Sequence, residues 1–512
     1  MQVEVISLQK KYLLGVDIGT YESKGVIWDA EGKVLNIQVS LHLLKIPKPG
    51  WAEHDPIEDW WMDFCSITRR LIKQTGIDPH EIAAVGCSSI AAALVPVDER
   101  CNPLRNAILY GIDTRSAPQI EELNRTIGVN RIKEVCVNQL SVDSIGPKIL
   151  WIKQNEPEIY ERTAHFTMTQ GFLLAKLTDQ YVLDKYSACG AAPMYNHHTK
   201  TWDNDLTKFV TEKERLPRIV DSTEIVGFVT AKAAKETGLA EGTPVVGGST
   251  DASAEAVSVG ILEPNDFMIM YGSTVYMIKV TTELRPNEIM WSADYVFPDL
   301  KAIVGGMATT GSLTRWIRDN FAKELVEREK SGGPNAYDTL FAEIGHISPG
   351  SDGVIVLPYF SGERIPLNDP KAKGVIFGLN LTHTRAHIFK AALEGVGYGI
   401  AQCLDYIRSL GFTADRITAV GGGTKNPDWM QIISDITGCV QSVPEVTVGA
   451  AYGDAIFAGL GVGLIKSRQE VKGWMKEKYT TIPDRKKTEV YRGYKEKYAL
   501  IYQSTKGIMH SL

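Results

Sequence analysis

A short pattern of glycine and hydroxyl residues occurs twice in the chain, each time between two apolar segments. The copies are residues 17–20, Asp-Ile-Gly-Thr, and residues 272–274, Gly-Ser-Thr. A tight turn of this composition presents backbone N–H groups and side-chain hydroxyls to an anion. Two such turns suggest that two halves of the molecule hold a polyphosphate between them. The repeat therefore predicts an enzyme that uses ATP.

The first turn also carries a carboxylate. Asp17 ends an otherwise apolar strand, where an ionised carboxylate is costly unless a cation or hydrogen-bond donors meet it. Mg²⁺ is a natural partner, because it keeps several waters and takes one or two carboxylates together with phosphate oxygens. Lys24 would then approach the transferring phosphate. The alternative, a plain hairpin turn, is disfavoured by the second copy of the pattern.

A second aspartate, Asp251, lies among glycine, serine, threonine and alanine in residues 247–254. Small residues let the backbone pack closely against a ligand and aim one carboxylate at it. A substrate hydroxyl loses its proton during phosphoryl transfer, and a positioned aspartate is a usual base. Asp251 also suits the N-cap of the helix expected to follow. The spacing alone leaves both roles open.

Three glycines, residues 421–423, follow a predicted strand and precede a helical segment, with Asn426 between. Their backbone could approach a flat or phosphorylated ligand closely, and the helix N-terminus would favour negative charge. Three consecutive glycines alone more often form an ordinary loop. The chain contains no G-x-x-x-x-G-K-[ST] phosphate loop.

Two other groups of polar residues favour structural roles. In the loop of residues 358–370 we expect Arg364 to pair with Glu363 or with a backbone carbonyl. The adjacent His197 and His198 could suggest a metal, but neighbouring side chains diverge and no carboxylate cluster accompanies them. We expect this pair in a surface turn.

The bulk properties are those of a soluble globular protein. A length of 512 residues favours two domains. Apolar residues make up 44% and charged residues 23% of the chain, which is ordinary for this class. The net charge of −6 argues against a general nucleic-acid binder, since such proteins carry a basic excess.

The cysteines and the apolar segments predict a reducing, cytoplasmic location without a membrane partner. The seven cysteines are odd in number, scattered and without a C-x-x-C pair, so we expect free thiols. Glu4 in the first segment is unlike a secretory leader. No apolar run approaches the roughly 20 residues that span a bilayer.

The order of predicted elements indicates an α/β protein with a duplicated domain. Residues 12–18 and 24–29 are predicted strands, residues 58–75 a helix and residues 82–88 a buried strand. Helical patterns dominate from 118 to 215. The composition changes to glycine and small residues around 240–250, which predicts domains of residues 1–246 and 247–512. The tail from Glu470, rich in Lys, Glu and Tyr, predicts solvated helices.

In combination these motifs resemble the FGGY family of carbohydrate kinases, which includes xylulokinase, gluconokinase and glycerol kinase. The resemblance covers about residues 12 to 470, with the motifs in the expected order. They are residues 17–20, residues 50–56 followed by Trp60 and Trp61, residues 144–151, Asp251, residues 272–274, residues 358–366, residues 421–423 and, beyond them, Gly449 to Asp454.

The resemblance implies two ribonuclease-H-like domains of the actin, hexokinase and Hsp70 type, which close over ATP, Mg²⁺ and a sugar. It implies that Asp251 is the base and that Asp17 holds the hydrated Mg²⁺. The two turns would hold the β- and γ-phosphates, and the glycines the nucleoside. The nucleotide-binding residues implied are Gly19, Thr20, Lys24, Gly272, Ser273, Thr274, Gly421, Gly422, Gly423 and Asn426.

The chain departs from the family on the sugar side. Residues 88–93 lack both the Gln-Met-His of many xylulokinases and the Arg-Glu of glycerol kinases, and Ala252 replaces the asparagine that commonly follows the base. The sugar must then be recognised elsewhere. The candidates are Trp51, Glu53, Asp113 and Arg115.

The leading interpretation is an ATP-dependent kinase of a small sugar, a ketopentose such as xylulose. Gluconate, ribulose, erythritol and glycerol stay open as substrates. An ATP-driven switch protein of the actin or Hsp70 kind would need no base such as Asp251, and a sugar-binding regulator would not need both Asp17 and Asp251. A homodimer is the commonest assembly for such a protein.

Overall fold

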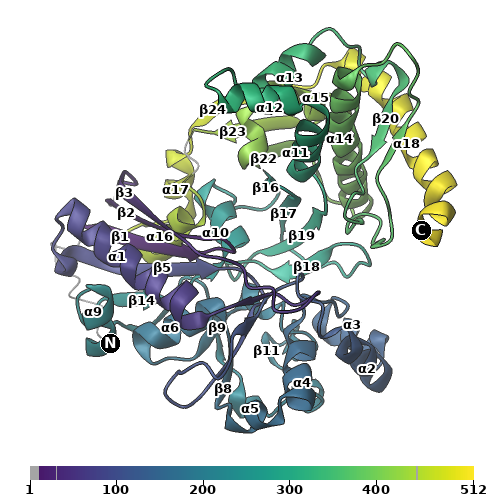
Figure 1. The fold of residues 1–512 in the computed structure, drawn as a ribbon. Coiled ribbons are helices and arrows are strands. Elements are labelled where there is room, and N and C mark those ends of the chain that lie inside the picture. The colour runs from purple at the N-terminus through teal and green to yellow at the C-terminus, as the bar shows by residue number, and fades with distance from the viewer. Residues whose placement is uncertain (1–10, 30, 446–447) are drawn as a thin grey trace.

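The computed structural model describes residues 11–29, 31–445 and 448–512, so Glu4 lies outside the described residues. Two seven-stranded sheets, each flanked by helices, form the framework. Figure 1 shows the first sheet in the lower half of the molecule and the second in the upper half, with α10 near their junction. The α/β class expected from the sequence is confirmed.

The first sheet has the strand order β13-β14-β5-β1-β2-β3, with β15 pairing to β5. The antiparallel neighbours are β1–β2, β2–β3 and β13–β14, and the parallel ones β1–β5 and β5–β14. The strands are β1 (Tyr12–Ile18), β2 (Glu22–Asp29), β3 (Val34–Leu41), β5 (Ile82–Ser89), β13 (Ile225–Phe228), β14 (Pro244–Val246) and β15 (Ser249–Thr250).

The second sheet repeats these pairings in the order β18-β19-β17-β16-β22-β23-β24. Its strands β16, β17 and β19 form an antiparallel meander, β22 and β23 continue parallel to β16, and β24 closes the edge antiparallel. The strands are β16 (Phe267–Tyr271), β17 (Val275–Thr281), β18 (Trp291–Asp294), β19 (Lys301–Met307), β22 (Arg416–Val420), β23 (Val440–Pro444) and β24 (Glu477–Thr481). The two glycine-hydroxyl turns join equivalent strands, β1 to β2 and β16 to β17.

Helices cover both faces of the first sheet at glycine positions. Helix α1 (Met62–Thr75) lies on β2, where a Cβ on Gly25 would come within 2.2 Å of Ile67. Helix α16 (Ala450–Gly461) comes from the second half of the chain and lies on β1 and β5. Position 15 of β1 must be glycine at this contact, because a Cβ on Gly15 would lie 1.9 Å from the Ala451 carbonyl oxygen.

Helix α16 also crosses helix α10 (Asp251–Ser258) in close contact. A Cβ on Gly453 would lie 1.9 Å from the carbonyl oxygen of Ala254, so only glycine fits. Because α16 packs on both α10 and β1, it holds Asp251, the first residue of α10, near the strand that carries Asp17.

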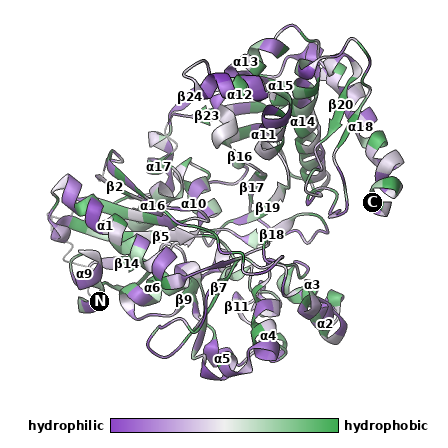
Figure 2. Cartoon of the chain, in the orientation of Figure 1, coloured by the Kyte–Doolittle hydropathy of each residue, from purple (hydrophilic) through white to green (hydrophobic). Residues whose placement is uncertain are grey.

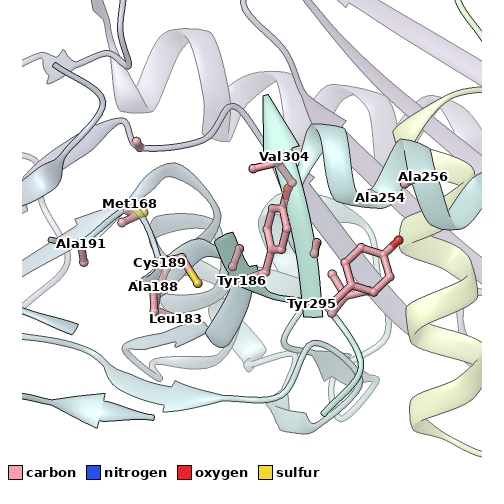
Figure 3. Close-up of a cluster of buried hydrophobic side chains, with 14 of the residues drawn as sticks. Met168, Leu183, Tyr186, Ala188, Cys189, Ala191, Ala254, Ala256, Tyr295 and Val304 are labelled. Atoms are coloured by element: carbon pink, nitrogen blue, oxygen red, sulfur yellow. The ribbon is translucent and has the colours of Figure 1, made fainter. Parts of the chain in front are cut away.

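The halves share one hydrophobic core. Tyr186 of helix α7 (Lys185–Ala188) meets Tyr295, which follows β18, edge to face at 6.2 Å between ring centroids. Figure 3 shows both rings in the same cluster as Ala254 of α10. A second core lies between the other sheet and helix α14 (Arg385–Ser409). Figure 2 shows hydrophobic colour on the central strands and polar colour on outer helices such as α12 (Lys323–Lys330).

The last helix, α18 (Arg485–Ser511), is only partly solvated, which corrects the expectation for the tail. It buries Tyr491, Tyr498, Tyr502 and Met509 in an aromatic cluster against β20 (Ile355–Leu357).

All seven cysteines lie within the described residues and are free thiols, as predicted. Among the described helices, none combines the length and the apolar character that a membrane crossing requires.

The crossing of α10 and α16 gives the first prediction. Gly453→Ala should lower the free energy of unfolding by about 1–3 kcal/mol, because the added methyl collides with backbone. Gly493→Ala, in α18 with nothing near its Cβ position, is the matched control and should stabilise slightly. Denaturant unfolding measures both, and equal midpoints for the two variants would contradict the close crossing.

Candidate active site

The first turn is held by hydrogen bonds from three directions. Gly19 N–H donates to Glu22 O (2.9 Å), and the hydroxyls of Thr20 and Tyr110 lie 3.0 Å apart. His42 contacts the Gly19 carbonyl through Nε2 (3.1 Å) and the Asp63 carboxylate through Nδ1 (2.9 Å). Both partners are acceptors, so the ring donates from both nitrogens and carries a proton on each.

The pKa of His42 agrees with this arrangement. Burial alone would lower the pKa, but the hydrogen bond and charge of Asp63, with the Gly19 carbonyl, raise it above its usual value. The imidazolium therefore supports the backbone of the first turn.

Asp17 lies next to the end of β1, beside Lys24 on β2 and Ser88 on β5. Its Oδ1 accepts a hydrogen bond from the Ser88 hydroxyl (2.9 Å). Burial raises the pKa of Asp17 to about 6, against the effects of Ser88 and Lys24. Within the described part of the chain, no hydrogen-bond donor binds Oδ2, which leaves that oxygen for another partner.

Asp251 is the first residue of α10, and it is not the cap. Thr250 is the N-cap residue, since its hydroxyl accepts from the N–H of Ser253 (3.4 Å). Asp251 Oδ1 accepts from Ala252 N–H (2.7 Å). Burial, and then the charge of Asp17, raise the pKa of Asp251 to about 8. The Asp251 carboxyl is thus fixed by one backbone hydrogen bond, and no cationic side chain is among the groups that shift its pKa.

Glu255, one turn along α10, joins the two aspartates. Burial and the charge of Asp17 raise its pKa to about 7, and Lys24 opposes them. Sequence reasoning missed this residue, although a carboxylate four positions after Asp251 on a helix must share its face. Asp17, Asp251 and Glu255 offer oxygen donors only, and burial is the main cause of their raised pKa values. Oxygen donors suit a hard cation such as Mg²⁺, but among the described residues these three carboxylates do not lie close enough together to bind one ion directly, so the ion would be held through its waters.

The second turn lies against the start of helix α11 (Gly311–Phe321). Gly272 N–H donates to Thr274 O (2.9 Å), and Ser273 O accepts from Thr310 N–H (3.0 Å) and Ser312 N–H (3.1 Å). The side chains of Ser273 and Thr274 are exposed.

The three glycines lie beside this second turn. Gly421 has φ of 90°, and a Cβ there would lie 2.8 Å from the Tyr271 carbonyl oxygen, so the position requires glycine. A Cβ on Gly422 would meet nothing within 4 Å, so this residue faces open space. Asn426 Oδ1 accepts from Trp429 N–H (3.1 Å) and caps helix α15 (Pro427–Thr437).

The four residues expected on the sugar side are brought together, but their charged atoms pair with one another. The guanidinium of Arg115 lies 2.7 Å from Asp113 Oδ2, 2.8 Å from Glu53 Oε1 and 3.8 Å from the ring centre of Trp51. Asp113 is fully buried and also accepts from Ala52 N–H (2.7 Å). The cluster fixes the shape of this wall.

Tyr110, three residues before Asp113, is a site residue that sequence reasoning missed. Its hydroxyl reaches Thr20. Burial, and to a smaller extent the charge of Asp251, raise its pKa, whereas the hydrogen bond from Thr20 lowers it. Tyr110 therefore places a phenol near both Asp251 and the first turn.

The histidine pair corrects one expectation. His198 is exposed, but His197 is buried, with Nδ1 3.7 Å from Asp294 Oδ2 and 3.9 Å from Cys189 Sγ. These three residues are of types that bind metals, but Asp294 is already paired with Lys301, whose Nζ lies 2.5 Å away.

Arg364 donates to the Met307 carbonyl (3.2 Å), which confirms the expected pairing with a backbone carbonyl.

Comparison with known proteins shows the family of the chain. The family model for the N-terminal domain of FGGY carbohydrate kinases matches residues 12–258, and that for the C-terminal domain matches residues 268–462. The chain belongs to the FGGY family of carbohydrate kinases. It is 27% identical to the xylulose kinase of Lactococcus lactis over 98% of both chains. It is also 27% identical to the gluconokinase of Bacillus subtilis, over 94% of this chain and 93% of that one.

Solved structures share the whole architecture of this FGGY kinase. The xylulose kinase from Rhodospirillum rubrum superposes with a TM-score of 0.90 and 27% identity over 98% of this chain and 100% of that one. The glycerol kinase of Plasmodium falciparum with ADP has the same fold, with a TM-score of 0.85 and 24% identity over 96% and 97%. The protein is a sugar kinase with two domains of the actin and hexokinase type.

The carboxylate cluster gives the second prediction. A carboxyl whose pKa is raised by folding binds its proton more tightly in the folded state, so stability is lost as pH rises through the folded pKa. In metal-free buffer the free energy of unfolding should fall as pH rises through the values of about 6, 7 and 8 of Asp17, Glu255 and Asp251.

Asp251→Asn removes one of these groups. The variant should be more stable than the wild type at pH 8 and should lose less stability between pH 5 and 8. The exposed Asp205→Asn is the control and should keep the wild-type slope. Thermal unfolding across this pH range measures the slopes; an unchanged slope in Asp251→Asn would rule out the raised pKa.

Proposed function

We propose that this kinase transfers the γ-phosphoryl group of ATP to a hydroxyl of a small sugar, most simply a ketopentose such as xylulose, with Asp251 as general base. The observation that carries the proposal is the position of Asp251. It begins α10 without capping it, is held by Ala252 N–H, and is close enough to Asp17 for that charge to raise its pKa.

The two turns are proposed to hold the phosphates from opposite halves. Thr20 is proposed to supply its N–H and hydroxyl from the first sheet, and Ser273 and Thr274 theirs from the second, because the N–H groups of Gly19 and Gly272 are bonded within their own turns. Gly421 and Gly423 pack against Tyr271, whereas Gly422 faces open space and leaves room for the nucleoside. We propose residues 1–246 and 247–512 as the two domains, with helices α10 and α16 of the second packed on the first sheet.

Asp17 is proposed to hold hydrated Mg²⁺ through its second carboxylate oxygen, with Glu255 as a further acceptor for the metal's waters. The bound cation would neutralise charge on the phosphates and on the three carboxylates. Lys24, which lies between Glu22 and Glu255, is proposed to approach the transferring phosphate.

The base step follows from Asp251. The sugar hydroxyl oxygen forms a bond to the γ-phosphorus while the bond from that phosphorus to the β–γ bridging oxygen breaks, and ADP keeps the electron pair. The hydroxyl proton passes to the Asp251 carboxylate. Burial and then the negative charge of Asp17 make this carboxylate a stronger base than an exposed aspartate.

The sugar side is proposed to consist of the wall formed by Trp51, Glu53, Asp113 and Arg115, with Tyr110 beside the base. The relatives named xylulose kinase and gluconokinase have equal identities of 27%, so the comparison alone favours neither sugar. The absence of polar side chains at residues 90–93 favours a small, uncharged substrate.

The third prediction tests the reaction and its base together. A coupled assay of ADP release across D-xylulose, L-xylulose, ribulose, gluconate, erythritol and glycerol should show turnover only with a polyhydroxyl substrate, fastest with a ketopentose. Asp251→Asn should lower kcat by about 10²–10⁴-fold, the usual contribution of a general base. The dissociation constant of ATP, measured by calorimetry, should stay within about threefold of wild type, because Asp251 is assigned to the sugar hydroxyl and not to the nucleotide.

The exposed Asp205→Asn serves again as the matched control. Wild-type turnover in Asp251→Asn would remove the assigned base. ATP hydrolysis that no sugar stimulates would instead indicate a nucleotide-driven switch protein.

A further inference from the structure

Ser88 lies between two carboxyl groups that come from distant parts of the chain. Its Oγ is 2.9 Å from Asp17 Oδ1 and 2.8 Å from Asp454 Oδ2. Ser88 belongs to β5 and is the strand neighbour of Asp17. Asp454 belongs to α16 and contacts the site across 366 residues of sequence. The motif from Gly449 to Asp454 therefore reaches the phosphate-binding end of β1.

The two contacts cannot both be donated by Ser88, because a hydroxyl has one proton. One hydrogen bond is donated by Ser88, and in the other Ser88 accepts from a protonated carboxyl. The surroundings of Asp454 favour the proton more than those of Asp17. The side chain of Asp454 is fully buried, and within the described residues Oδ1 has no partner and no salt bridge reaches the carboxyl. Asp17, in contrast, lies beside the cation of Lys24 and is only half-buried.

The electrostatics agree with that assignment. Burial raises the pKa of Asp454 well above its usual range, and the charges of Asp17 and, more weakly, Asp251 raise it further, although hydrogen bonds with Ser88 lower it. A neutral acid in this position donates to Ser88, and Ser88 then donates to Asp17.

The backbone of Asp454 is fixed as firmly as its side chain. A Cβ on Gly86, two residues before Ser88, would lie 2.1 Å from the Asp454 carbonyl oxygen. Helix α16 thus lies directly on β5, and the preceding residue, Gly453, crosses α10. The hydrogen-bonded series Asp454–Ser88–Asp17 therefore starts from a position that is closely packed against β5.

We propose that Asp454 is a positioning residue for the kinase reaction: as a hydrogen-bond donor to Ser88 it fixes the orientation of the Asp17 carboxylate and leaves Oδ2 for the metal side. This inference rests on the proposed function, since it assigns Asp17 the role described above. It assigns Asp454 no contact with either substrate.

Three variants separate this role from simple burial. Asp454→Asn keeps a donor towards Ser88, so kcat and the Mg²⁺ concentration for half-maximal rate should stay within about threefold of wild type. Asp454→Leu keeps similar volume without a donor, and Ser88→Ala removes the middle of the chain. Each should raise the half-maximal Mg²⁺ concentration or lower kcat by about tenfold, which corresponds to about 1.4 kcal/mol, the scale of one hydrogen bond. The double variant Asp454→Leu with Ser88→Ala should lose no more kcat or Mg²⁺ affinity than either single variant, because the two residues act as one unit.

Two measurements do not depend on turnover. The infrared difference spectrum of wild type minus Asp454→Asn should show the C=O stretch of a protonated carboxyl, and calorimetric Mg²⁺ binding to the protein should weaken in Asp454→Leu but not in Asp454→Asn. If the wild type lacked sugar-stimulated turnover, the proposed function would fail while these two results still decided the hydrogen-bond chain.

The proposal is overturned if Asp454→Asn is as impaired as Asp454→Leu, since an ionised carboxylate would then be required. It is also overturned if the difference spectrum shows a carboxylate band, or if Asp454→Leu lowers only the unfolding midpoint. Should Asp454→Leu fail to fold, Ser88→Ala with normal metal dependence would overturn it equally.

Discussion

The close crossing of helices α10 and α16 is the contact on which the site depends. It is possible only because Gly453 brings no side chain against Ala254, while Gly15 and Gly86 let α16 lie on the backbone of β1 and β5. Asp251 at the start of α10 is thereby brought close enough to Asp17, at the end of β1, for their charges to interact. Interiors are close-packed, so small changes at this crossing must displace Asp251 relative to Asp17.

The second constraint is the close placement of three carboxyl groups, those of Asp17, Asp251 and Glu255, near this crossing. Burial raises the pKa values of the half-buried Asp17, Asp251 and Glu255, and the charge of Asp17 raises those of the other two further. A divalent cation bound beside them would favour their ionised forms. The raised pKa of Asp251 is the property that the proposed general base requires.

Much of this could be predicted from local sequence. The strands around the first turn, the glycine-hydroxyl repeat and the α/β class follow from apolar runs and turn residues that are close in the chain. The base-or-cap choice for Asp251 could not be settled, because Thr250 is equally good as a cap until its hydrogen bond is seen. The contact between Ser88 and Asp454 spans 366 residues, and the buried His197 lies 3.7 Å from Asp294 of β18, almost a hundred residues away. Local patterns carry no information about such distant neighbours.

The central claim is that the two turns hold one nucleotide from opposite sheets, with Asp251 facing its terminal phosphate. A crystal structure with Mg²⁺, a non-hydrolysable ATP analogue and a ketopentose tests it most directly. The account predicts phosphates between Thr20 and Thr274, the nucleoside over Gly422, the metal on the Asp17 side and a sugar hydroxyl within hydrogen-bond distance of Asp251. A nucleotide bound to one sheet alone, or a sugar remote from Asp251, would contradict it.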